Sequence, residues 1–125
     1  MPLTVTSDEG KGFVTIHAAG SLDSNTYTQL EERVAAARAT NPHAIVFDLK
    51  DLTYISSAGV RVIVATQRAM KAAGGSMAIA NMQPQIRRVF EIIMTLPAMN
   101  VFESVAELDN YLTAIQKKVL GQDEA

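Results

Sequence analysis

The stretch AIVFDLKDLTYISSAGVRVIVATQRAMKAAGG, residues 44–75, decides the fold. It opens with a continuous apolar run, Ala44 to Leu49, which is typical of a central parallel strand covered on both faces. The next long segment, Ala58 to Ala73, has a β-branched start that favours a strand. Its length favours a helix instead, because strands rarely run so far without a turn residue. Gly74 and Gly75 then end the helix, as glycines commonly do.

The polar residues of this predicted helix support that interpretation. Arg61, Arg68 and Lys71 fall on one stripe, and the rest of the surface is apolar. We therefore expect neighbouring elements to cover most of the helix.

The residues before this stretch predict a hairpin and a helix. Leu3 to Thr6 and Phe13 to Ala18 are strand candidates joined by the turn SDEGKG, and the second alternates apolar and polar positions as a half-buried strand does. Apolar residues follow at helical spacing, and the sequence NPH ends that helix. The segment GSLDSNT offers three residues as caps for its start: Asp23, Ser24 and Asn25.

The residues after this stretch add a strand and two helices. We expect a buried strand at Ser76 to Ala80, a helix that begins near Pro84, a short strand around Met99 to Phe102, and a last helix capped by the box SVAE, residues 104–107. The order β-β-α-β-α-β-α-(β)-α predicts an α/β fold with one mixed sheet of four to five strands and about four helices, joined by right-handed crossovers.

Composition excludes several classes of function. The 125 residues suit one domain, with 48% apolar and 19% charged residues and a formal charge of −2. Nothing in that charge favours nucleic acid or a membrane surface. The chain has no cysteine and shows neither a signal peptide nor an apolar run long enough to cross a membrane, which fits the cytoplasm.

The serine pair Ser56–Ser57 stands between the short extended piece LTYI and the first turn of the predicted helix. A hydroxyl there can cap the helix by accepting a bond from a free backbone N–H. The same position also favours negative charge, so that the fold would tolerate a phosphate on a serine exposed to a partner. A hydrolase that uses Ser57 as its nucleophile is a further alternative. The first glycine of the G-x-S-x-G elbow is missing, however, and both histidines, His17 and His43, precede the serine.

Three segments in order resemble the STAS family, and within it the stand-alone anti-sigma factor antagonists of bacteria. The segments are GSLDSNTYTQLEERV, IVFDLKDLTYISSAGVRVIV and AMKAAGGSMAIANMQPQIRRVFEI, and the likeness extends from about Leu3 to Leu112. The family's phosphorylation motif is usually Asp-Ser-Ser/Thr-Gly. Aligned on Gly59, it makes Ser57 the acceptor, with Ser56 as the second choice, and Ser56 replaces the motif's aspartate.

The resemblance implies a STAS-type sandwich over residues 1–118, followed by a flexible tail at 119–125. It implies a protein that binds an anti-sigma factor with serine kinase activity, is released when Ser57 is phosphorylated, and is reset by a PP2C-type phosphatase. The protein would be a substrate and not an enzyme, without cofactor, metal, direct nucleic-acid contact or membrane insertion. The expected partner-binding residues are Asp23, Ser24, Ser56, Ala58, Gly59 and Arg61. The alternative within the family is a subunit that regulates the ATPase of an ABC-type transporter.

Overall fold

The computed structural model describes residues 2–95 and 104–124, and the strands among them form one mixed sheet. The five strands are β1 (Leu3–Glu9), β2 (Phe13–Leu22), β3 (Ala44–Asp48), β4 (Leu52–Ile55) and β5 (Ser76–Ala80). The main path of the sheet is β1-β2-β3-β5, in which only β1 is antiparallel to its neighbour. The long strand β2 pairs with β3 through its first half and, after a shift of register at Gly20, with β4 through its last residues.

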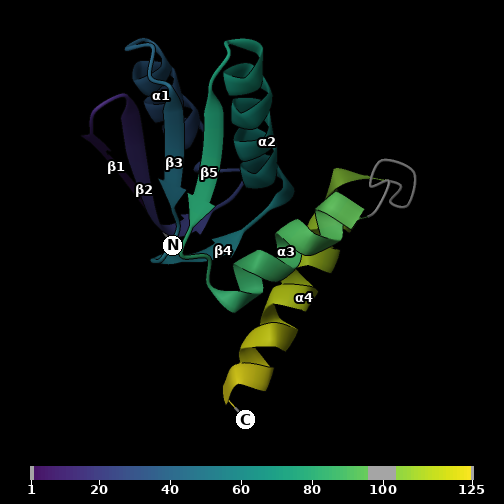
Figure 1. The fold of residues 1–125 in the computed structure, drawn as a ribbon. Helices are drawn as coiled ribbons and strands as arrows, with labels where there is room; N and C mark the ends of the chain where they lie inside the picture. Colours follow the sequence, from purple (N-terminus) through teal and green to yellow (C-terminus); the bar gives the residue numbers. More distant parts are fainter. Residues whose placement is uncertain (1, 96–103, 125) are drawn as a thin grey trace.

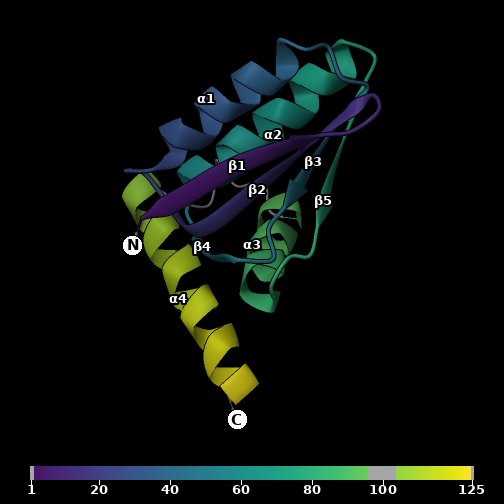
Figure 2. The ribbon, with the colours of Figure 1, turned by 90° about the vertical axis from the view of Figure 1, so that its left-hand side faces the viewer.

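Four helices in the described residues lie in two pairs (Figure 1). Helices α1 (Tyr27–Arg38) and α2 (Ser57–Ala72) lie side by side against one face of the sheet, as Figure 2 shows. Helices α3 (Pro84–Thr95) and α4 (Val105–Glu124) run side by side in opposite directions at the end of the sheet where β4 lies (Figure 1). The predicted α/β architecture and the mixed sheet are confirmed.

Alternating residues of the strands build the core. Val14, Ile16 and Ala18 of β2 are buried under α1 and α2, which confirms the half-buried pattern. Leu30, Val34 and Ala37 of α1 are also buried at helical spacing. Burying an aliphatic side chain of this size contributes about 1.5–3 kcal/mol, so these faces hold the two layers together.

Helix α2 confirms the prediction made from its length, although its start is β-branched. It spans Ser57–Ala72, and Arg61, Arg68 and Lys71 are exposed as expected. The backbone of Gly74 has a φ of +81°, and the N–H of Gly75 donates to the carbonyl of Met70 at 2.7 Å. This left-handed turn ends the helix at the predicted place.

Two strands are less buried than the sequence predicts. In β3, Ile45 and Phe47 are fully buried but the alternate residues are only half-buried, so the described residues cover one face of the strand more closely than the other. Strand β5 is an edge strand among the described residues, with Ser76 and Ala78 exposed. The prediction of a fully buried strand was wrong at both places. The strand predicted at Met99 to Phe102 lies outside the described residues.

The start of α1 and the end of α4 also differ from expectation. Thr26, and none of the three predicted cap residues, occupies the cap position of α1, because Asp23 already begins the preceding turn by accepting from Tyr27 N–H through its carbonyl. Helix α4 is capped as predicted, with Glu107 N–H donating to Ser104 Oγ at 3.1 Å. It continues to Glu124, through most of the segment predicted as a tail. The boundary at residue 118 stays a prediction.

Candidate functional site

The loops that follow β2 and β4 lie side by side because these two strands are parallel and end at the same edge of the sheet. The N–H of Ser56 donates to the carbonyl of Leu22 at 2.9 Å, which ties the serine pair to the start of the Asp23 loop. The sequence segments SLDSN and SSAG therefore lie side by side at one edge of the sheet.

Gly59 allows the first turn of α2 to approach this edge closely. A Cβ at this position would lie 2.6 Å from Leu22 Cγ and 2.9 Å from Ile55 Cγ1, both of which belong to fully buried side chains. Only a residue without a side chain fits here. The start of α2 is thereby held firmly against the ends of β2 and β4.

Both serines are buried, which contradicts the expectation of an exposed hydroxyl. The exposed fractions are 3% for Ser56 and 7% for Ser57. Ser56 occupies the cap position of α2 with an extended backbone, but its hydroxyl makes no capping bond. Within the part of the chain that the structure describes, neither Ser56 Oγ nor Ser57 Oγ has a hydrogen-bond partner. The interpretation of these hydroxyls as helix caps was therefore wrong.

The cap of α2 comes from α4. Asp109 Oδ1 accepts a hydrogen bond from Ser57 N–H at 2.8 Å. A carboxylate at a helix N-terminus satisfies a free N–H and is favoured by the helix dipole. Asp109 thus satisfies the N–H of the first helical residue, from a position 52 residues away in the sequence.

Two further residues of α4 bind the neighbouring strand. Gln116, which is 2% exposed, accepts from Ile55 N–H at 3.0 Å and donates to the Ile55 carbonyl at 2.8 Å. Its side-chain amide thus pairs with β4 as a neighbouring strand would. The Tyr54 and Thr113 hydroxyls lie 2.8 Å apart. We call Asp109, Thr113 and Gln116 the α4 latch.

Sequence reasoning missed the α4 latch. These residues recur at the helical spacing of the apolar stripe that includes Leu112, so they share the face of α4 that turns toward the body of the protein. A glutamine within that stripe is the available signal. Its partners could not be named, because they lie in a distant segment.

Asp23 lies in a network of hydrogen bonds at the start of the neighbouring loop. Its carboxylate accepts from Asn25 N–H at 2.8 Å and from the Ser21 hydroxyl at 3.0 Å. Burial acts to raise the pKa of Asp23, but these bonds and one from Thr26 outweigh it and hold the pKa below its usual value. Asp23 is therefore charged at neutral pH and orders its own loop.

The other predicted site residues differ in accessibility. Ser24 and Arg61 are exposed, and Ala58 is half-buried. These three residues flank the buried serine pair. The rim of the site is consequently open to a partner, whereas its centre is closed.

Neither histidine is placed to activate Ser57. His17 Nε2 lies 3.0 Å from Asp8 Oδ2, and His17 Nδ1 lies 3.3 Å from Asp48 Oδ2. His43 lies beside Gly12 at the hairpin, where β3 begins. Among the described residues no group forms a hydrogen bond with Ser57 Oγ, so the hydrolase alternative gains no support from this arrangement.

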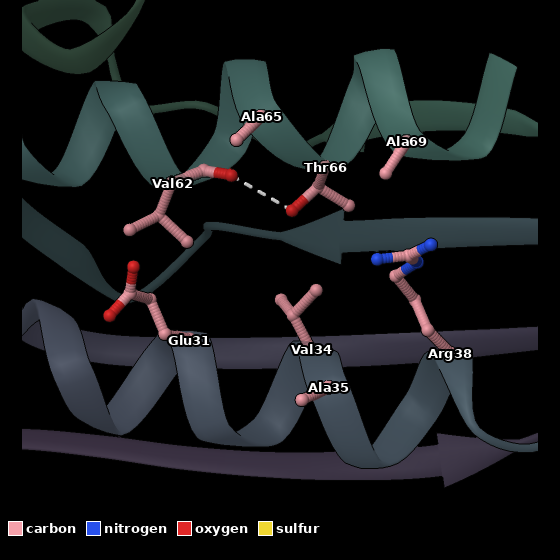
Figure 3. Close-up of a pocket in the computed structure, with 8 residues that line it drawn as sticks. All are labelled: Glu31, Val34, Ala35, Arg38, Val62, Ala65, Thr66 and Ala69. Carbon is pink, nitrogen blue, oxygen red and sulfur yellow. Dashed lines mark hydrogen bonds between the residues drawn. The ribbon is translucent and has the colours of Figure 1, made fainter. Parts of the chain in front are cut away.

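A shallow cavity of about 200 Å³ lies between α1 and α2 (Figure 3). Small apolar side chains of both helices line it, with Glu31 and Arg38 at its two ends. The Thr66 hydroxyl donates to the carbonyl of Val62 at 2.8 Å and is thereby occupied within its own helix. The cavity contains neither serine of the pair, and its two charged residues, Glu31 and Arg38, lie at opposite ends.

Residues 2–95 and 104–124 contain no cluster of three or more histidine, cysteine, aspartate or glutamate side chains suited to a metal ion. They also contain no helix of sufficient length and hydropathy to span a bilayer.

A model of the STAS domain matches residues 4–108, and the chain belongs to this family. A protein of Bordetella bronchiseptica named as the anti-sigma factor antagonist BtrV is 31% identical over 107 residues, which are 83% of this chain and 92% of the relative.

Solved structures agree on the fold. An anti-sigma factor antagonist from Mycobacterium paratuberculosis superposes with a TM-score of 0.68 at 24% identity, over 91% of this chain and 94% of that one. The Bacillus cell fate determinant SpoIIAA in its phosphorylated form gives a TM-score of 0.60 at 22% identity, over 72% of this chain and 83% of that one.

Proposed function

We propose that this protein is an anti-sigma factor antagonist that works by partner switching, with Ser57 as the residue that is phosphorylated. The observation that carries the proposal is the position of Ser57 in the first turn of α2, directly beside the loop of Asp23. Membership of the STAS family and a relative named as an antagonist of the same class support it. Such a protein acts in the cytoplasm, where sigma factors work.

In the proposed cycle, the unmodified protein binds an anti-sigma factor that is also a serine kinase, and this releases the sigma factor. The kinase then transfers the γ-phosphoryl group of ATP to Ser57. The Oγ–P bond forms, the bond from the γ-phosphorus to the bridging oxygen breaks, ADP leaves, and the hydroxyl proton passes to a base of the kinase. A PP2C-type phosphatase resets the protein: water attacks the phosphorus, the serine oxygen is protonated and inorganic phosphate leaves.

The proposed binding surface is the rim around the serine pair, formed by the two loops and the first turns of α2. The proposed partner-binding residues are Asp23, Ser24, Ser56, Ala58, Gly59 and Arg61, of which Ser56 and Gly59 are buried in the free protein. A phosphate adds about −1.5 to −2 charges at the centre of this surface. Where the kinase presents a carboxylate about 5 Å away, one like-charge pair at an effective dielectric of about 20 costs roughly 3 kcal/mol, which is about a hundredfold in affinity.

The test is to incubate the protein with its kinase and ATP and to map the phosphate by mass spectrometry. We expect phosphate on Ser57, no phosphate in Ser57→Ala, and normal phosphorylation of Ser56→Ala. Ser57→Ala should still bind the kinase, because it keeps the unmodified surface. Phosphate on Ser56, or failure of the unmodified protein to bind the kinase, would refute the assignment.

A further inference from the structure

The hydroxyl of Ser57 is buried in the free protein, whereas the proposed function requires a kinase to reach it. Ser57 Oγ has essentially no accessible surface and no partner in the described residues. Phosphoryl transfer needs the acceptor oxygen in line with the leaving group of ATP and next to a base of the kinase. Some element that covers Ser57 must therefore move before transfer.

Within the described residues, α4 reaches Ser57 from a distant part of the chain, through the bond from Ser57 N–H to Asp109 Oδ1. The first turn of α2 packs closely at Gly59 against the buried side chains of Leu22 and Ile55, so α4 is the better candidate to move. Helix α4 is held to β4 and α2 through the hydrogen bonds of the α4 latch, and its Leu112 is fully buried. Parts of a protein open locally at free energies below that of global unfolding, so α4 can open while the sheet stays folded.

The α4 latch also occupies the position that favours an anion. Asp109 Oδ1 is 2.8 Å from Ser57 N–H, at the positive end of α2. A phosphate on Ser57 would take the same N–H and would bring about two further negative charges next to the carboxylate. The Asp109 carboxylate and the phosphate cannot both bind at the N-terminus of α2. Because the phosphate is covalently attached to Ser57, we expect the carboxylate to leave.

We propose that α4 is a built-in cover over Ser57, which must leave for phosphorylation and which the phosphate then holds off by displacing Asp109. The role of the phosphate rests on the proposed function, whereas the cover is a property of the free protein. The first half of α4 is thereby a second responsive element of the switch, in addition to the serine loop.

Amide hydrogen exchange followed by NMR measures the opening of α4 in the free protein, without any partner. The N–H of Ile55 and that of Ser57 bond to Gln116 and Asp109, so they report on α4. The neighbouring N–H of Ser56 and that of Val60 bond to Leu22 and Ser56, so they serve as internal controls. In Ser57→Glu we expect exchange at Ile55 to rise about tenfold to a hundredfold, as one added like-charge pair implies.

A second substitution tests whether charge is the cause. Asp109→Asn keeps an oxygen that can accept from Ser57 N–H but removes the negative charge. In the double variant Ser57→Glu/Asp109→Asn, we expect most of the protection at Ile55 to return. Unchanged protection in Ser57→Glu, or equal loss in the single and double variants, would overturn the proposal. Protection in the paired residues of β2 and β3 shows that each variant remains folded.

The rate of phosphorylation separates this proposal from the proposed function. Gln116→Ala weakens the cover without changing the rim, and we expect its phosphorylation to be about tenfold faster than that of the matched control Lys117→Ala, whose side chain is exposed. Equal phosphorylation rates together with unchanged exchange would refute the cover by α4 and leave the proposed function unaffected. Faster exchange without any phosphate on Ser57 would support the cover and refute the proposed phosphorylation of Ser57.

Discussion

Asp109 caps the helix that begins at Ser57, although the two residues lie 52 positions apart in the sequence. A helix usually takes its cap from the residue just before it. In this protein that residue, Ser56, leaves its hydroxyl without a partner in the described residues. The N-terminus of α2 is consequently stabilised by α4, and the serine pair does not perform that role.

The contributions of Ser56 and Asp109 to the stability of the protein can be compared by substituting each residue with alanine. Replacing a working cap by alanine costs about 1 kcal/mol. We expect Asp109→Ala to lower the free energy of unfolding by about that amount and Ser56→Ala to change it by less than about 0.5 kcal/mol. Urea denaturation of both variants, with the exposed Asn110→Ala as control, gives the comparison. A larger loss in Ser56→Ala than in Asp109→Ala would show that the local cap operates after all.

Gln116→Ala should be far more destabilising than a change at the neighbouring exposed Lys117. It leaves both peptide groups of Ile55 without their partner, and an unpaired buried polar group costs about 1–3 kcal/mol. We expect a loss of about 2–4 kcal/mol, against less than about 0.5 kcal/mol for Lys117→Ala. Thermal or urea unfolding measures this difference. Equal stability of the two variants would mean that water replaces the glutamine at no cost.

Gly59→Ala should destabilise the protein by about 1–3 kcal/mol, because the added methyl group overlaps Leu22 and Ile55. Gly121→Ala is the matched control. Gly121 also lies in a helix, but an added methyl group meets nothing within 4 Å, so this variant should be up to about 1 kcal/mol more stable. Denaturation curves for the pair check the contrast, and a stabilising Gly59→Ala would contradict the close approach of α2.

The Asp23 network predicts a pH dependence. Hydrogen bonds lower the pKa of Asp23 in the folded protein below the value of 3.8 taken as its reference. Its contribution to stability is therefore fully present above pH 3.8 and is lost as the pH falls through the lower, folded pKa. The gap in unfolding free energy between the unmodified protein and Asp23→Asn should be largest near neutral pH and should shrink below about pH 3.8.

Asp48 does not disturb this comparison. Burial acts to raise its pKa, and hydrogen bonds from Lys50 and Asn81 outweigh burial and lower it. Because Asp48 is present in both proteins, its titration cancels in the difference. A gap that stays constant from pH 7 to pH 2 would mean that the charge of Asp23 is unimportant to the fold.

Local pattern was sufficient to predict most of the elements. The unbroken length of the segment after Ser56 predicts α2 against the preference of its β-branched residues, and the structure confirms it. The alternation in β2 and the helical spacing in α1 likewise name residues that are buried. These features depend on residues a few positions apart, so one sequence contains the needed information.

The state of the serine pair could not be predicted in this way. Whether Ser57 is open depends on Asp109 and Gln116, and nothing in SSAG refers to them. The edge position of β5 was missed for the same reason, because it depends on which other strands pair with β5 and the residues of β5 do not specify this. Where a prediction needs a partner from another element, local propensity does not supply it.

The α4 latch also sets an order in time. Its contacts join residues 52, 59 and 61 positions apart, and the chain is made from its N-terminus. Strands β1 to β4 and helix α2 are therefore complete before Asp109 has been synthesised. A nascent chain at that stage lacks the residues that bind Ser57 N–H and the peptide groups of Ile55. Each molecule thus begins without these contacts, and the finished chain has to make them afterwards.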